Sequence, residues 1–100
     1  NIENLDKEHD VGLFLSENPT VNDLTNLRVF KWLKNTVESS DQSLRFGFIS
    51  SQLHNSLIND PKPYRKDVKI YVSVLFEWVE YFELYEITKH RRTVSIKSLG

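Results

Sequence analysis

The sequence predicts an α+β domain with three helices, one short strand and a C-terminal β-hairpin. Two segments, residues 24–37 and 64–83, carry apolar residues at spacings of three and four, which is the period of a helix. Residues 84–99 contain two short runs typical of strands around a polar centre, which indicates a hairpin. The chain has 100 residues, a length that fits one domain.

The first helix is predicted to begin after the stretch Thr-Val-Asn-Asp at residues 20–23, which has the form of a capping box. In such a box the Thr20 side chain accepts from the amide three residues on, and the Asp23 carboxylate reaches back to the amide of Thr20. The buried face of this helix is expected to contain Leu24, Leu27, Phe30, Leu33 and Val37.

The N-terminal segment, residues 1–19, has little period, and we expect it to form an arm or a linker before a domain that covers residues 20–100. The first residue is not methionine, so we expect the chain to be part of a larger protein.

The middle of the chain is predicted to form a short strand and a compact helix. Residues 44–49, Leu-Arg-Phe-Gly-Phe-Ile, alternate roughly and indicate a strand, in which Gly47 would permit a close backbone approach. Residues 50–58 indicate a helix that buries Leu53 and Leu57.

The third helix has the strongest signal, over residues 64–83. One apolar stripe runs from Val68 to Phe82 and a second runs from Ile70 to Tyr81, which places this helix at the centre of the domain or in an interface. In the hairpin that follows, one face is expected to hold Tyr85, Ile87, Val94 and Ile96.

The order helix, short strand, helix, helix, hairpin resembles the winged-helix form of the helix-turn-helix superfamily. The resemblance covers roughly residues 20–99 and rests on element order and length. It implies that the short strand pairs with the hairpin and that the hairpin loop is the wing. In DNA-binding members of that superfamily, the start of the third helix and the wing meet the major groove and the adjacent backbone or minor groove.

The formal net charge of −1 conceals an asymmetry. Residues 1–44 carry eight Asp/Glu and four Lys/Arg, a net charge of −4, whereas residues 45–100 carry six Asp/Glu and nine Lys/Arg, a net charge of +3. The basic part suggests a polyanionic partner, and the acidic part argues against a protein that simply coats nucleic acid.

Two basic clusters occupy the regions that the resemblance assigns to DNA: the start of the third helix and the tip of the hairpin. Arginine suits both places because its planar guanidinium binds phosphate and can enter a narrow minor groove. A solvated surface without a partner is the simpler alternative. The candidate DNA-binding residues are Lys62, Tyr64, Arg65, Lys66, Lys69, Lys89, His90, Arg91, Arg92 and Lys97.

Acidic residues on the third helix limit this hypothesis. Glu77, Glu80 and Glu83 are three apart and form a stripe that repels phosphate. Only the first turn or two of the helix can then enter a groove. The residues after Lys69 are mostly apolar and cannot hydrogen-bond base edges, so we expect low sequence specificity.

The aromatic content supports a rival hypothesis, a module for protein interaction or homodimerisation on the same scaffold. Aromatic residues make up 12% of the chain, and some of those on the third helix are candidates for an exposed partner surface. The alternative is that these rings fill the core.

Enzymatic chemistry is not expected. No nucleophile-elbow, Walker or dinucleotide-binding motif is present, and the three histidines lack the spacing of a zinc site. No cofactor, metal site or membrane segment is predicted either. The sequence therefore predicts a duplex-DNA-binding module of a chromatin, replication or transcription protein, which implies a nuclear or otherwise intracellular location.

Overall fold

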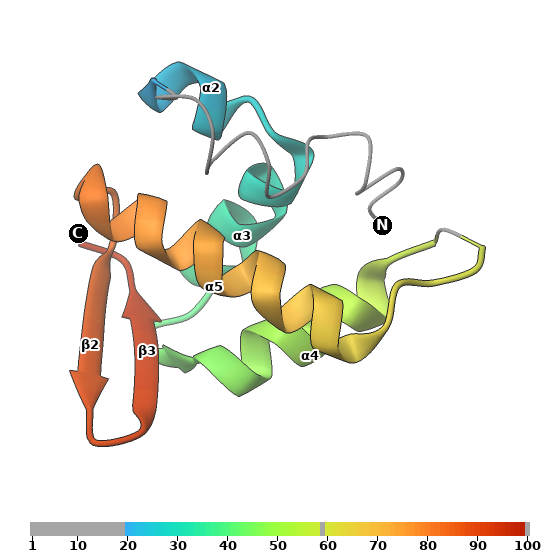
Figure 1. Ribbon diagram of the computed structural model, residues 1–100. Coiled ribbons are helices and arrows are strands. Elements are labelled where there is room, and N and C mark those ends of the chain that lie inside the picture. Colours follow the sequence, from blue (N-terminus) through green and yellow to red (C-terminus); the bar gives the residue numbers. More distant parts are fainter. Residues whose placement is uncertain (1–19, 59, 100) are drawn as a thin grey trace.

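The protein is described here by a computed structural model that covers residues 20–58 and 60–99 (Figure 1). This part contains helices and a three-stranded antiparallel sheet, which confirms the predicted α+β class. The arm or linker predicted over residues 1–19 lies outside the described residues. The elements are α2 (Val21–Thr25), α3 (Arg28–Glu38), β1 (Leu44–Arg45), α4 (Phe46–Ser56), α5 (Arg65–Tyr81), β2 (Glu86–His90) and β3 (Thr93–Lys97).

The predicted first helix is in fact two helices, α2 and α3. The capping box is present: the Asp23 amide donates to Thr20 Oγ1 at 3.2 Å, and the Thr20 amide donates to Asp23 Oδ2 at 2.9 Å. The helix breaks at Leu27, whose extended backbone (φ −67°, ψ 140°) caps α3. Leu27 is buried at the break, and the apolar residues predicted for one continuous helix are buried in both α2 and α3.

The strand predicted over residues 44–49 is shorter than expected, because only Leu44 and Arg45 pair with β3 and α4 begins at Phe46. The helical start places Phe46 edge-on against Phe76 of α5, with ring centroids 5.6 Å apart. Gly47 makes no close backbone approach, since a Cβ there would meet nothing within 4 Å. Packing against α5 therefore outweighs the rough alternation of this stretch.

Helix α5 crosses the middle of the fold and packs along α4 (Figure 1). Its first predicted stripe is buried from Val68 to Val79. The second stripe lies at the edge of the buried face, because Ile70 is 49% exposed and Tyr81 is 72% exposed. The helix thus buries one broad face and leaves the other to solvent.

The sheet has the order β1-β3-β2, with β3 in the centre. Ile96 pairs with Leu44 on one side and with Ile87 on the other. Because Ile96 is fully buried, this register directs the apolar face of the hairpin into the core, as the sequence predicts.

The base of the hairpin is attached to α3 through Tyr85. Its ring stacks on Phe30 with centroids 6.2 Å apart, and its hydroxyl donates to Glu38 Oε2 at 2.9 Å. Burial raises the pKa of Tyr85 well above its usual value, and the hydrogen bond and negative charge of Glu38 raise it further. The contact fixes the hairpin relative to the helices.

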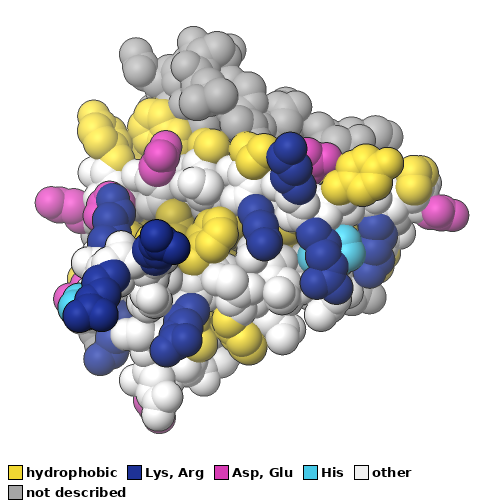
Figure 2. Space-filling model, turned by 60° about the horizontal axis from the view of Figure 1, so that its bottom comes forward, with side chains coloured by type: hydrophobic (Ala, Val, Ile, Leu, Met, Phe, Trp, Pro, Cys, Tyr) yellow, Lys and Arg dark blue, Asp and Glu magenta, His cyan; other side chains and the backbone are white. Residues whose placement is uncertain are grey.

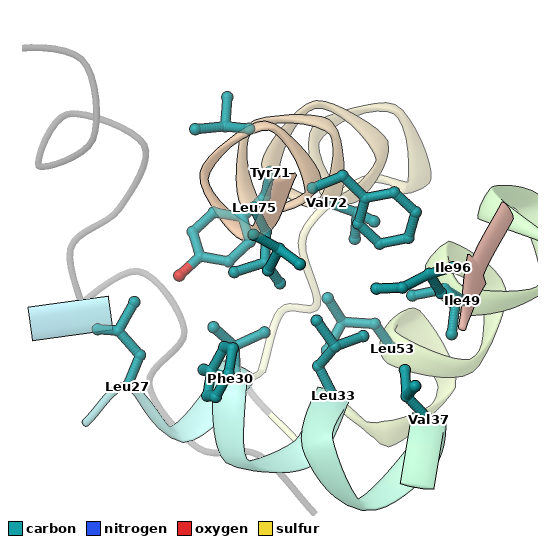
Figure 3. Close-up of a cluster of buried hydrophobic side chains, with 14 of the residues drawn as sticks. Leu27, Phe30, Leu33, Val37, Ile49, Leu53, Tyr71, Val72, Leu75 and Ile96 are labelled. Carbon is teal, nitrogen blue, oxygen red and sulfur yellow. The ribbon is translucent and has the colours of Figure 1, made fainter. Parts of the chain in front are cut away.

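The core lies between α3, α4, α5 and the central strand (Figure 3). Side chains from all four elements meet there, so the apolar face of each element is covered by side chains from the others. The residues labelled in the figure are Leu27, Phe30, Leu33, Val37, Ile49, Leu53, Tyr71, Val72, Leu75 and Ile96.

Candidate nucleic-acid interface

The first basic cluster lies at the start of α5, beside α4. Arg65 and Lys69 of α5 line a crevice of about 80 Å³ together with Ser50, Ser51 and His54 of α4. The close packing of the two helices therefore places cations of one helix beside polar groups of the other.

The loop before α5 is held against α4 by two polar contacts. His54 Nε2 lies 3.2 Å from the Pro63 carbonyl oxygen, and Lys62 Nζ donates to the His54 carbonyl at 3.4 Å. A carbonyl oxygen can only accept, so Nε2 carries the proton of this bond. His54 thus holds the segment that delivers the cations against α4.

All five candidates of this cluster reach solvent. Tyr64, the N-cap of α5, is 80% exposed, which leaves its hydroxyl open to a partner. The exposed cations are Lys62, Arg65, Lys66 and Lys69.

The second cluster is at the tip of the hairpin, where Arg91 and Arg92 form a two-residue turn between the paired residues His90 and Thr93. Arg91 has a left-handed backbone (φ 57°), a conformation that costs a residue other than glycine about 1–2 kcal/mol. Hairpin turns of this length normally place Gly, Asn or Asp at such positions. By backbone conformation alone, an arginine is therefore a locally unfavourable residue at this position.

The other candidates near the hairpin differ from the two arginines. Lys89 pairs with Glu80 of α5 at 3.2 Å, so its charge is partly offset. Lys97 lies opposite Glu86 in the register of β2 and β3. It is four residues from Thr93, about 13 Å along the strand from the tip. His90 is exposed beside the tip. The structure thus places His90 with the arginines but separates Lys97 from them.

A larger cleft, of about 510 Å³, lies between the start of α4 and the hairpin tip. It brings Arg45 of β1 to the same cleft as Arg92 of the tip. Phe48, which is 47% exposed, also lines it. Sequence reasoning missed Phe48 because it placed this residue in a strand, and it missed Arg45 because only the pairing of β1 with β3 brings that residue to the cleft. The helical spacing of Phe46, Ile49 and Leu53 is the signal that places this segment in α4.

The exposed side of α4 connects the two clusters. Phe48 lines the cleft at the hairpin tip and Ser51 lines the crevice at α5, and these residues are one helical turn apart. Figure 2 shows Lys and Arg side chains spread over the face that the hairpin tip, α4 and the start of α5 present together. Asp and Glu side chains lie toward its margins in this view.

The C-terminal half of α5 is acidic, as the sequence predicts. Glu77 and Glu80 line a third hollow of about 230 Å³ beside Lys89. Along α5, only the start of the helix therefore offers favourable charge to an anion.

Other kinds of site are not found in the part of the chain that the structure covers. Residues 20–58 and 60–99 contain no group of His, Cys, Asp and Glu side chains arranged to bind a metal ion. Within the same ranges, no helix is both long and apolar enough to cross a bilayer. Comparison with protein-family models, curated proteins and solved structures finds no match to this chain.

Proposed function

We propose that this chain is a winged-helix module that binds double-stranded DNA through its phosphate backbone, with low sequence specificity. The sheet order β1-β3-β2, with a short first strand followed by two helices and a hairpin, supports the winged-helix interpretation. On this interpretation α4 and α5 form the helix-turn-helix and the turn Arg91–Arg92 is the wing.

The observation that carries the proposal is that α4 borders both basic clusters. The crevice at α5 supplies Arg65 and Lys69, and the cleft at the hairpin supplies Arg45 and Arg92. Cations on two sides of one exposed helix can contact phosphates of the same duplex. Such contacts set affinity and orientation but do not read sequence.

Low specificity follows from what α5 exposes beyond its first turns. The side chains that follow Lys69 on the exposed side are Ile70, Ser73 and Glu77. Isoleucine cannot hydrogen-bond a base edge, and glutamate repels the backbone that must lie beside it. We propose that such a module serves a larger chromatin, replication or transcription protein, for which a nuclear location would follow from the DNA binding.

The proposal is tested by fluorescence anisotropy with a labelled duplex at low salt. We expect the Arg65→Glu/Lys69→Glu and Arg91→Glu/Arg92→Glu variants each to lose more than about tenfold in affinity, because each removes two charge-assisted contacts. Lys97→Glu is the matched control at the far end of the hairpin and should bind nearly as tightly as the wild type. Unchanged binding by both double variants would refute the proposal.

A protein-interaction module is the second candidate, and one observation favours it. Trp78, Tyr81 and Phe82 form a mutually packed aromatic group at the end of α5, with ring centroids 5.2–5.6 Å apart. Tyr81 is 72% exposed, as an anchor residue would be. This candidate would be favoured if the wild type binds no DNA but forms an oligomer in solution, and if Tyr81→Ala converts that oligomer to monomer.

A further inference from the structure

The cleft beside the hairpin tip combines apolar side chains with two arginines, and binding to phosphate would need only the arginines. Its apolar wall is formed by Leu44, Phe46 and Val94, and its lining also includes Arg45 and Arg92. Within the described residues, neither guanidinium has a hydrogen bond or an ion pair. Both cations are thus available to an anionic ligand.

Phe48 is the unusual member of this cleft. Its neighbour Phe46 packs against Phe76, whereas Phe48 makes no ring contact among the described residues and is 47% exposed. An exposed phenyl ring next to cations is a surface on which a nucleobase can stack, because every base has a π-face. The adjacent arginines can bind the phosphates on either side of that base.

The size of the cleft also fits such a ligand. A volume of about 510 Å³ falls within the range of about 300–1,000 Å³ that small-molecule sites occupy. Inside a continuous duplex both faces of a base are covered by its neighbours. Only a nucleotide that has left the stack, at a strand end, gap or bulge, can present a face to Phe48.

We propose that the cleft between α4 and the hairpin tip binds one unpaired nucleotide, whose base stacks on Phe48 and whose flanking phosphates contact Arg45 and Arg92. This inference rests on the proposed DNA binding and deepens it. The preferred substrate is then a duplex with an interruption, and the two basic clusters hold the paired part beside it.

The test compares two labelled DNAs with the full chain: a continuous duplex, and the same duplex with one unpaired thymine in its centre. Wild type is expected to bind the interrupted duplex about 5- to 150-fold more tightly, the range that stacking of one base supplies. Phe48→Ala should abolish this preference, so that the interrupted duplex binds no more tightly than the continuous one. Phe48→Tyr, which keeps a stacking ring, should retain the preference.

A second measurement locates the nucleotide without any substitution. The unpaired thymine is replaced by 5-iodouracil, the complex is irradiated, and the cross-linked peptide is identified by mass spectrometry. We expect the cross-link at Phe48. Equal affinity for the two DNAs, or a cross-link outside the cleft, overturns the inference while leaving duplex binding intact. Failure to bind either DNA overturns both proposals.

Discussion

The arginine at the left-handed position of the hairpin turn permits a test in which stability and DNA affinity change in opposite directions. Arg91 has φ 57°, a conformation that costs about 1–2 kcal/mol for a residue other than glycine. Glycine adopts it freely but loses about 0.5–1 kcal/mol more conformational entropy on folding. The difference spans about 0–1.5 kcal/mol, so Arg91→Gly is expected to raise the free energy of unfolding by a central value of about 0.5–1 kcal/mol.

In a domain of this size, that gain corresponds to an increase in Tm of about 2–8 °C, which is measurable by circular dichroism. The same substitution would remove one of the proposed phosphate contacts, so the affinity for duplex DNA should fall. A more stable protein that binds more weakly is the expected signature of an arginine kept at the tip for its side chain.

Arg92→Gly is the matched control, because Arg92 does not have a positive φ. Glycine at this position brings only the entropic cost of about 0.5–1 kcal/mol, so the control should lower Tm by about as much as Arg91→Gly raises it. The control should also weaken DNA binding. The reasoning is refuted if Arg91→Gly lowers Tm. It is also refuted if Arg91→Gly raises Tm but leaves the affinity for DNA unchanged, since the strained arginine would then have no role in binding.

Three further substitutions test the packing described above. Gly47→Ala should raise the free energy of unfolding by about 0.4–1 kcal/mol in chemical denaturation, because the added methyl meets nothing and the residue is helical; a loss would mean that the helix does not begin at Phe46. Leu53→Ala removes a fully buried side chain and should cost about 2–5 kcal/mol; a loss below 1 kcal/mol would place Leu53 outside the core. Tyr85→Phe should cost about 1 kcal/mol at pH 7. The raised pKa of Tyr85 means that the folded state holds the proton more tightly, so wild-type stability should fall as the pH rises above about 10, and Tyr85→Phe should lack this part of the loss.

The strongly periodic parts of the fold could be predicted from the sequence. The capping box at Thr20, the central helix and the hairpin register all depend on local patterns, and the structure contains each of them. The two errors differ in cause. At Leu27 a change of backbone direction leaves the apolar residues buried, so the hydrophobic pattern does not reveal the break. At Phe46 the rough alternation of residues 44–49 conceals the helical spacing that begins there.

The candidate site could be predicted only in part, for a related reason. Each basic cluster falls within a short stretch of sequence and could be predicted, although the structure separates Lys97 from the tip and pairs Lys89 with Glu80. Arg45 joins the surface only because β1 pairs with β3 and brings it near the tip. Contacts between segments so distant in the chain leave no local pattern.

The salt dependence of DNA binding tests the central claim, that both basic clusters contact one duplex. The logarithm of the association constant should fall linearly with the logarithm of salt concentration, with a slope of about −0.9 for each phosphate contacted. The slope should become less negative by about 1.8 in each double variant, Arg65→Gln/Lys69→Gln and Arg91→Gln/Arg92→Gln, because each loses two phosphate contacts. Lys97→Gln should leave the slope unchanged. A slope near zero, or one that neither double variant alters, would contradict the account.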